Sequence, residues 1–310
     1  MTGTRVVVAL GGNALLRRGE SAEAETQRRN VLEAASALAA VATRHELVVT
    51  HGNGPQVGLL ALEADAYKAV SPYPLDVLGA ESQGMIGYLL VQALQNELPD
   101  REVAALLTQV VVDAADLAFS HPTKPIGPVY SEREARELAR EHNWTIARDG
   151  SYFRRVVPSP KPEAIVEIET IKMLVGNGAV VVCSGGGGVP VVKERGRFRG
   201  VEAVIDKDLT AALLAQALGA ERLVLATDVP FVETDWGTNA ASPIISATPS
   251  DLRTLQFAAG SMAPKIEAAC RFVEHTGCSA AIGSLAELEA VISGTAGTQI
   301  VSSRIACATA

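Results

Sequence analysis

Two lysines stand where helices are expected to begin, each after a segment that contains glycine. Lys207 lies between Asp206 and Asp208 at the start of a helical pattern. Pro264 suits the first turn of a helix, which places Lys265 in the first turn of a second one. A cation at this end of a helix is unfavourable by roughly 0.3–1 kcal/mol, because the helix dipole is positive there. One such lysine is usually a solvated surface residue, whereas two indicate positive charge gathered for an anion.

Two glycine-rich loops each follow an apolar, β-branched run. Their residues are Gly11, Gly12 and Asn13 in the first loop and Gly52, Asn53 and Gly54 in the second. Glycine lets a ligand approach the main chain closely, and asparagine adds two donors on a short arm. Either loop alone is also compatible with a tight turn between a strand and a helix. Together they predict loops lined with N–H groups that hold an anion.

These residue types suit phosphoryl transfer, which depends mainly on positioning and on neutralising charge. Asp208 could orient Lys207 and Lys265 together, or hold water on a magnesium ion. Two other phosphate motifs are excluded. The chain has no G-x-x-x-x-G-K-[ST] motif, and SGGGG is followed by VPVV, not by the helix that a dinucleotide site requires.

Apolar β-branched runs alternate with segments of helical periodicity along most of the chain. The runs cover residues 5–10, 46–50, 103–112, 179–184, 222–229, 278–284 and 298–302. This alternation predicts a three-layer α/β/α sandwich with a mainly parallel open sheet. Ligands bind at the carboxyl ends of the strands in such sheets, so we expect the glycine loops and TDV (227–229) to meet at one edge.

Residues 114–160 interrupt this alternation. The segment is rich in proline and aromatic residues and contains a charged helical stretch (131–142) and a DG turn signal between two short runs. We interpret 1–310 as a single domain with 114–160 as a small protruding lobe inserted into it, in a position suited to a lid. A surface excursion without function is the alternative.

Composition excludes several classes of protein. The 310 residues are 48% hydrophobic and 20% charged, which is ordinary for a globular protein. The net charge of −8 and the lack of a basic block disfavour a nucleic-acid partner. No apolar run reaches the roughly 18 residues of a membrane span, and the N-terminus lacks the pattern of a signal peptide, so we expect a cytoplasmic protein. The histidines do not cluster and the four cysteines have no CxxC spacing, so we expect buried structural thiols and no metal ligands among them.

The chain resembles the carbamate kinases of the amino acid kinase family over nearly its whole length. The matching blocks are ALGGNALLRRGE, THGNGPQVG, ESQGMIGY, TKPIGPVY, RRVVPSPKP, GGGGVPVV, GVEAVIDKDL, FAAGSMAPKIEA and GTQI. The resemblance implies the amino acid kinase fold and reversible phosphoryl transfer between ATP and carbamate, with Mg²⁺, giving ADP and carbamoyl phosphate. It also implies a homodimer and, in organisms that ferment arginine, use of the reaction for ATP synthesis.

The resemblance assigns roles to the residues singled out above. The two glycine loops would hold the transferring phosphoryl group and the acceptor. Lys265 would reach the β- and γ-phosphates, Asp208 would organise both lysines, and Lys124 in the lobe would swing over the phosphoryl group. The nucleotide site would be lined by Thr227, Asp228, Val229 and Met262. Acetylglutamate kinases carry a lysine where this chain has Ala9, and Lys207 would supply that charge instead.

Other interpretations stay open. The chain could be another phosphotransferase of the family that acts on a different small acid or phosphate, or a nucleotide-binding regulator that has lost catalysis. Gln83 and Tyr88 are interpreted as packing or dimer-interface residues. Arg154 and Arg155 could be hairpin surface charges or functional groups, and no role is assigned to Trp236.

Overall fold

A central eight-stranded sheet organises the molecule. The computed structural model describes residues 3–17, 19–21, 23–67, 71–258, 261–303 and 307. The strand order is β15-β17-β16-β12-β1-β2-β9-β3, and all paired neighbours run parallel except β16 and β17. The strands are β1 (Arg5–Leu10), β2 (Glu46–His51), β3 (Val103–Ala105), β9 (Val180–Val182), β12 (Arg222–Thr227), β15 (Ser246–Ala247), β16 (Ser279–Ser284) and β17 (Thr298–Ile300).

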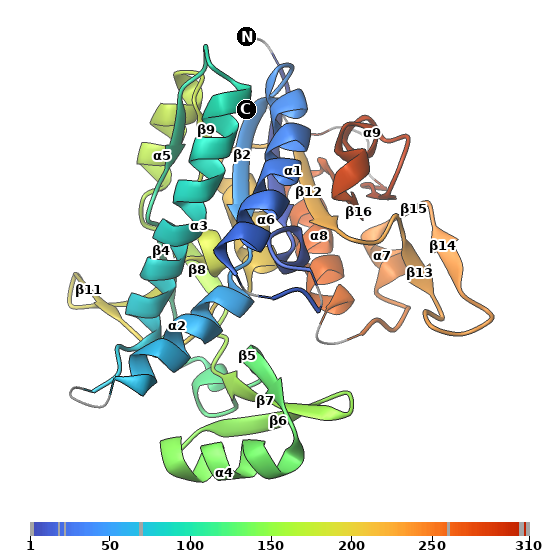
Figure 1. Ribbon diagram of the computed structural model, residues 1–310. Helices are drawn as coiled ribbons and strands as arrows, with labels where there is room; N and C mark the ends of the chain where they lie inside the picture. The colour runs from blue at the N-terminus through green and yellow to red at the C-terminus, as the bar shows by residue number, and fades with distance from the viewer. Residues whose placement is uncertain are drawn as a thin grey trace.

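Helices cover both faces of this sheet, as the alternation of strands and helices predicts. In β1 the side chains of Val6 and Val8 enter one core, which contains residues of α1 (Ala24–Ala42), α3 (Leu75–Glu97) and α9 (Leu288–Ser293). Val7 and Ala9 enter the other core, with α5 (Ile168–Gly176), α6 (Lys207–Ala217) and α8 (Met262–Thr276) (Figure 1). Successive strand residues point to opposite faces, so both faces of β1 are apolar and buried. The predicted three-layer α/β/α sandwich is confirmed.

The run 103–112 was expected to be one strand and is two. β3 ends at Ala105, and β4 (Gln109–Val112) belongs to a second sheet of order β11-β10-β4-β8. The backbone N–H of Thr108, between the two strands, donates to Oε1 of Gln83 on α3 at 2.9 Å. A side chain from a distant helix therefore satisfies the backbone where the chain leaves one sheet for the other. The partners of β4 are β8 (Pro162–Ile165), β10 (Val189–Glu194) and β11 (Arg197–Gly200).

A lobe made of residues 124–157 protrudes from the body (bottom of Figure 1). It contains a three-stranded antiparallel sheet of order β5-β7-β6 and one helix. Its elements are β5 (Lys124–Tyr130), α4 (Glu132–His142), β6 (Thr145–Asp149) and β7 (Tyr152–Val157). Ser131 and Glu134 form a capping box at the start of α4, and Gly150, with φ +62°, makes the turn between β6 and β7.

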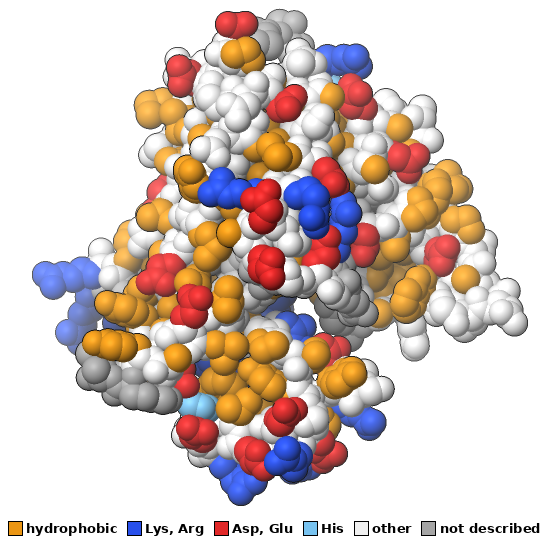
Figure 2. Space-filling view, viewed as in Figure 1, with side chains coloured by type: hydrophobic (Ala, Val, Ile, Leu, Met, Phe, Trp, Pro, Cys, Tyr) orange, Lys and Arg blue, Asp and Glu red, His pale blue; other side chains and the backbone are white. Residues whose placement is uncertain are grey.

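The lobe rests on helix α2 (Gly54–Ala66) of the body. Ile126 of β5 and Val157 of β7 are buried in one small core with Val57 and Ala61 of α2. Figure 2 shows hydrophobic side chains gathered over the upper part of the lobe, where it meets the body. Burial of apolar surface thus holds the two parts together.

Two of the four cysteines differ from the expectation of free buried thiols. Cys278, which precedes β16, and Cys307 form a disulfide bond. Cys183 and Cys270 are free and buried, and burial raises the pKa of the Cys183 thiol to about 12 and that of Cys270 to about 11. The expectation rested on spacing alone, and spacing did not show that the chain after β17 returns to Cys278. Within the described residues no helix has the length and apolar content that a membrane crossing needs.

Three further short elements complete the body. They are β13 (Val232–Thr234), β14 (Ser242–Ile244) and α7 (Pro249–Leu252). β13 and β14 pair as an antiparallel hairpin that projects at the right of Figure 1.

Candidate active site

The two glycine loops lie against each other at the carboxyl edge of the central sheet. Gly11 donates its N–H to the carbonyl of Ala226, at the end of β12, and Gly52 donates to the carbonyl of Leu10, at the end of β1, both at 3.1 Å. A methyl group at Gly52 would lie 3.2 Å from the nitrogen of Gly12 and 3.4 Å from the side chain of Lys207. A side chain at 52 would therefore be tightly packed, and this close approach brings both loops beside Lys207.

Asn53 is held by residues from two other elements. It is buried, and its Nδ2 donates to Oγ of Ser82 on α3 at 2.7 Å. A methyl group at Gly186, in the SGGGG loop after β9, would overlap the Asn53 side chain. The third glycine loop thus leaves room for the asparagine of the second. Gly54 begins α2. Asn13 lies in the 3-10 turn Gly12–Ala14, and its side chain lies outside what the structure describes.

Lys207, Asp208 and Lys265 form a compact group, which we call the Asp208 cluster. Nζ of Lys207 lies 2.6 Å from Oδ1 of Asp208, and Nζ of Lys265 lies 2.9 Å from Oδ2. The three side chains are 11%, 5% and 12% exposed, in chain order. Helix α6 begins at Lys207 and α8 at Met262, so both lysines lie in or beside the first turn of their helices, as the sequence predicts.

The electrostatics of the Asp208 cluster favour an anion. Burial alone would raise the pKa of the Asp208 carboxyl, but Lys207 and Lys265 together hold it below its ordinary value. Burial lowers the pKa of Lys207 to about 8, and the attraction of Asp208 opposes that shift. At neutral pH two ammonium groups therefore share one carboxylate, which leaves one net positive charge beside the glycine loops.

Lys124 reaches the same region from the lobe. Its Nζ lies 2.6 Å from Oδ2 of Asp206, and the two side chains are 30% and 12% exposed. Asp206 is also the N-cap of α6, because its Oδ1 accepts hydrogen bonds from the N–H groups of Asp208 at 2.9 Å and Leu209 at 3.3 Å. One carboxylate thus connects the start of α6 with the lobe. In the sequence Asp206 stands out only as a neighbour of Lys207.

His51 is a further buried group that the sequence analysis did not assign to the site. Its Nδ1 lies 3.0 Å from the carbonyl of Gly52, and a methyl group at Gly185 would overlap the ring. Burial, together with the charge of Lys207, lowers the pKa of His51 to about 4. The imidazole is therefore neutral and packs between the second and third glycine loops. The signal that could have identified it is its position directly before Gly-Asn-Gly.

The residues expected around a nucleotide lie at two places: the end of strand β12 and the start of helix α8. Thr227 ends β12, and its Oγ1 donates to Oδ1 of Asp228 at 3.1 Å. Val229 follows and is half-buried. Met262 begins α8 and packs against the core that α6 and α8 share. Because Lys265 is three residues after Met262, the start of α8 connects these residues to the Asp208 cluster.

The side chains present suit a magnesium ion that is carried by phosphates. Among the residues that the structure describes, no three acidic, histidine or cysteine side chains are grouped as metal ligands. Both oxygens of Asp208 accept hydrogen bonds from lysines, which favours its role in orienting them. Mg²⁺ commonly keeps several waters and binds substrate phosphates with few protein ligands. The arrangement fits that mode.

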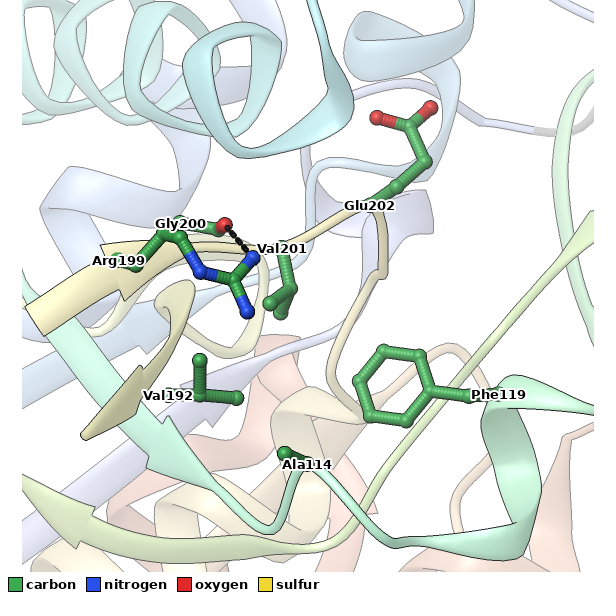
Figure 3. Close-up of a pocket in the computed structure, with 7 residues that line it drawn as sticks. All are labelled: Ala114, Phe119, Val192, Arg199, Gly200, Val201 and Glu202. Atoms are coloured by element: carbon green, nitrogen blue, oxygen red, sulfur yellow. Dashed lines mark hydrogen bonds between the residues drawn. The ribbon is translucent and has the colours of Figure 1, made fainter. Parts of the chain in front are cut away.

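A separate pocket of about 330 Å³ lies between β10, β11 and the loop before the lobe. Figure 3 shows Phe119 facing Val192 and Val201 across it, with Arg199 at one side. None of the predicted site residues lines this pocket. It is therefore distinct from the edge at which the glycine loops and lysines meet.

Comparison with known proteins identifies the family. The amino acid kinase family model matches residues 4–284. A carbamate kinase of Rhizobium meliloti is 54% identical, covering 96% of this chain and 94% of the relative; for one of Pyrococcus furiosus the values are 46%, 96% and 99%. A structure of carbamate kinase from Giardia lamblia bound to AMP-PNP has a TM-score of 0.88 at 40% identity, covering 97% of this chain and 99% of that chain. The chain therefore belongs to the amino acid kinase family, is similar to the carbamate kinases within it, and is a kinase, a phosphotransferase.

Proposed function

We propose that the protein catalyses reversible phosphoryl transfer between ATP and carbamate, giving ADP and carbamoyl phosphate. Proteins named carbamate kinase are 45–54% identical over 95–96% of this chain, which supports this choice of substrates. The observation that carries the proposal is the Asp208 carboxylate, which holds the ammonium groups of Lys207 and Lys265 beside two glycine loops.

In the direction of ATP formation, the bond between phosphorus and the carbamate oxygen breaks. A bond from the same phosphorus to a terminal oxygen of ADP forms, and carbamate leaves as an anion. The N–H groups of Gly12 and Gly54 would bind oxygens of the transferring group, while those of Gly11 and Gly52 hold the loops to the sheet by donating to the carbonyls of Ala226 and Leu10. Lys207 would neutralise charge near carbamate, and Lys265 would do so on the nucleotide side. Such preorganised charges stabilise the transition state because they need no rearrangement during the reaction.

Ala9 supports carbamate kinase activity over other activities of the family. Its side chain is fully buried on the face of the sheet that α6 covers. The resemblance places a lysine at this position in acetylglutamate kinases. We propose that Lys207, which begins α6 on that face, supplies the charge here.

The nucleotide would bind along Thr227, Asp228, Val229 and Met262, with Lys265 directed to its β- and γ-phosphates. The structure of a Giardia relative bound to AMP-PNP supports a nucleotide ligand for this fold. Mg²⁺, held by the phosphates, would neutralise their charge. We propose that Lys124 approaches the transferring group from the lobe, which acts as a lid over the single domain.

We further propose a cytoplasmic homodimer that makes ATP during arginine fermentation. ATP and ADP are substrates found in the cytoplasm, and the resemblance supports the assembly and the pathway. Sedimentation of the purified protein tests the dimer. Loss of growth on arginine without oxygen, after deletion of the gene, tests the pathway.

The test of the activity is ATP formation from ADP and carbamoyl phosphate, with acetyl phosphate as a competing donor. We expect rapid ATP formation from carbamoyl phosphate and little from acetyl phosphate. Preference for another donor in a panel of acyl and nucleotide phosphates would instead identify a different kinase of the family. ADP binding without turnover of any donor would identify a regulator.

A further inference from the structure

The backbones of the lobe and the body come close together at two glycines. Gly58 lies within α2, and Gly127 lies within β5 with φ +69°. A methyl group at Gly58 would overlap the Cα and nitrogen of Gly127. A methyl group at Gly127 would lie 3.6 Å from the Cα of Gly58, which is an ordinary contact. The space between the two backbones therefore leaves no room for a side chain at position 58.

Gly127 is fixed within the lobe, so a displacement at this point is transmitted to the rest of β5. Nη2 of Arg154, on β7, donates to the carbonyl of Gly127 at 2.6 Å. β5 pairs with β7 from Lys124 to Ile126 and again at Tyr130, and Gly127 lies in the register shift between them, where Pro125 and Pro128 restrict the backbone on either side. Gly127 directly follows the paired residues Lys124–Ile126, so a shift at Gly127 is passed on to them through the chain.

Lys124 lies on the same strand, three residues before Gly127. At about 3.3 Å per residue, the contact with α2 is roughly 10 Å from Lys124 along β5. Lys124 meets Asp206 at 2.6 Å, and Asp206 is the N-cap of the helix that carries Lys207. The position of β5 against α2 therefore decides whether the side chain of Lys124 reaches the start of α6.

The other contacts along α2 tolerate small shifts. Ile126 packs against side chains of α2, and Nδ1 of His142 on α4 lies 3.1 Å from Oδ1 of Asp65 near the end of α2. Away from α2, Nη2 of Arg155 on β7 lies 3.8 Å from Oε1 of Glu202. Side chains at these points can adjust their rotamers, whereas two backbones in contact cannot. Of these contacts, the one between Gly58 and Gly127 therefore adjusts least to a shift of the lobe.

We infer that Gly58 is a positioning residue that sets how far the lobe closes, and thereby places Lys124 over the transferring phosphoryl group. The absence of a side chain at 58 lets β5 seat on α2. This inference rests on the proposed function for its kinetic consequence. Its structural part, the closed position of the lobe, does not depend on the substrate.

The variant Gly58→Ala tests the inference, because it adds one methyl group at the contact and leaves the expected nucleotide residues unchanged. Alanine is a better helix former than glycine, so α2 should not be weakened. The added methyl group should hold the lobe away from α2. Displacing the lobe opens part of the small core that it shares with α2, so we expect a lower melting temperature, with ADP affinity within about twofold of the wild type. A displacement of Lys124 near 1 Å should lower kcat/KM for carbamoyl phosphate roughly 10- to 100-fold.

Gly176→Ala is the matched control. Gly176 ends α5, and a methyl group there would have no heavy atom within 4 Å. We expect this variant to keep the kinetics of the wild type. Wild-type kinetics for Gly58→Ala would overturn the inference, and so would equal losses of ADP affinity and turnover.

A double-mutant cycle shows whether Gly58 acts through Lys124. If it does, Gly58→Ala should cost less than about twofold in a Lys124→Ala background. Additive losses would overturn the route through Lys124.

Hydrogen exchange of residues 124–130 gives a readout that needs no activity: Gly58→Ala should speed exchange there and leave α8 unchanged. Equal exchange in both proteins would overturn the inference, whereas a wild type inactive on carbamoyl phosphate would overturn only the proposed function.

Discussion

Two aspartates at the start of α6, Asp206 and Asp208, hold lysines in different ways. The Asp208 cluster joins the starts of α6 and α8 within the body, and its three side chains are at most 12% exposed. The Asp206–Lys124 contact joins the body to the lobe, and Lys124 is 30% exposed. The first contact is buried between elements that pack on one core, and the second depends on where the lobe rests.

The difference separates charge that is always present from charge that is delivered. Asp208 keeps two buried ammonium groups charged in the absence of substrate, at the cost of burying all three groups. Asp206 pairs with Lys124 in a more exposed place, so Lys124 can move away without leaving a fully buried, unpaired charge. A site built this way can admit its substrate with the lobe raised and add the last cation as the lobe closes. Each prediction below tests one side of this contrast.

The largest effects are expected from removing the fixed lysines. Lys207→Ala and Lys265→Ala should each lower kcat at least about 100-fold, as the loss of one preorganised donor does in other enzymes. Each variant should fold, since Asp208 keeps one lysine and no buried charge is left alone. Steady-state kinetics and thermal melting check both points. A folded variant with near wild-type turnover would remove that lysine from the mechanism.

The sequence was a good guide where local rules decide the structure. The first turns that hold Lys207 and Lys265 were predicted from helix-start signals, and the common edge of the glycine loops followed from the rule for parallel sheets. The break at Thr108 was not predictable, because the partner of its N–H is Gln83, on a helix and 25 residues away in the sequence. The Lys124–Asp206 contact joins residues 82 positions apart and depends on the position of the lobe relative to the body. Such long-range contacts leave no local pattern.

Removing the delivered lysine should cost less and act differently. Lys124→Ala should lower turnover about 10- to 100-fold and weaken binding of carbamoyl phosphate, because Lys124 is more exposed than the fixed lysines. ADP affinity, measured by calorimetry, should stay nearly intact, because the expected nucleotide residues all lie in the body. Unchanged kcat and KM for carbamoyl phosphate would show that the lysine of the lobe does not reach the chemistry.

The pH dependence should report the fixed cluster. Burial lowers the pKa of Lys207 to about 8, so kcat/KM should fall as pH rises through 8, by up to about tenfold per unit, as the ammonium group loses its proton. The effect of this group on stability has the opposite sign. Between about 8 and the ordinary value of 10.5 the unfolded chain binds more protons, so its contribution to stability rises with pH.

The variant Lys207→Arg separates this cause from others. Arginine stays protonated throughout this range. The falling limb of kcat/KM should therefore move above pH 9 in the variant, whatever its absolute rate. A limb that stays near pH 8 would assign the titration to another group.

The smallest effect is expected from Asp206→Asn. Asparagine is as good an N-cap as aspartate, so α6 should keep its first turn and the melting temperature should hardly change. Only the charge that meets Lys124 is lost. A partly exposed ion pair contributes about 0.2–1 kcal/mol, so the KM for carbamoyl phosphate should rise at most about fivefold. In Asp208→Asn, by contrast, two buried lysines lose the carboxylate that both of them contact, which should cost about 3–5 kcal/mol of stability. The KM for carbamoyl phosphate and the melting temperature are measured for both variants. Equal changes in Asp206→Asn and Asp208→Asn would contradict the distinction between fixed and delivered charge.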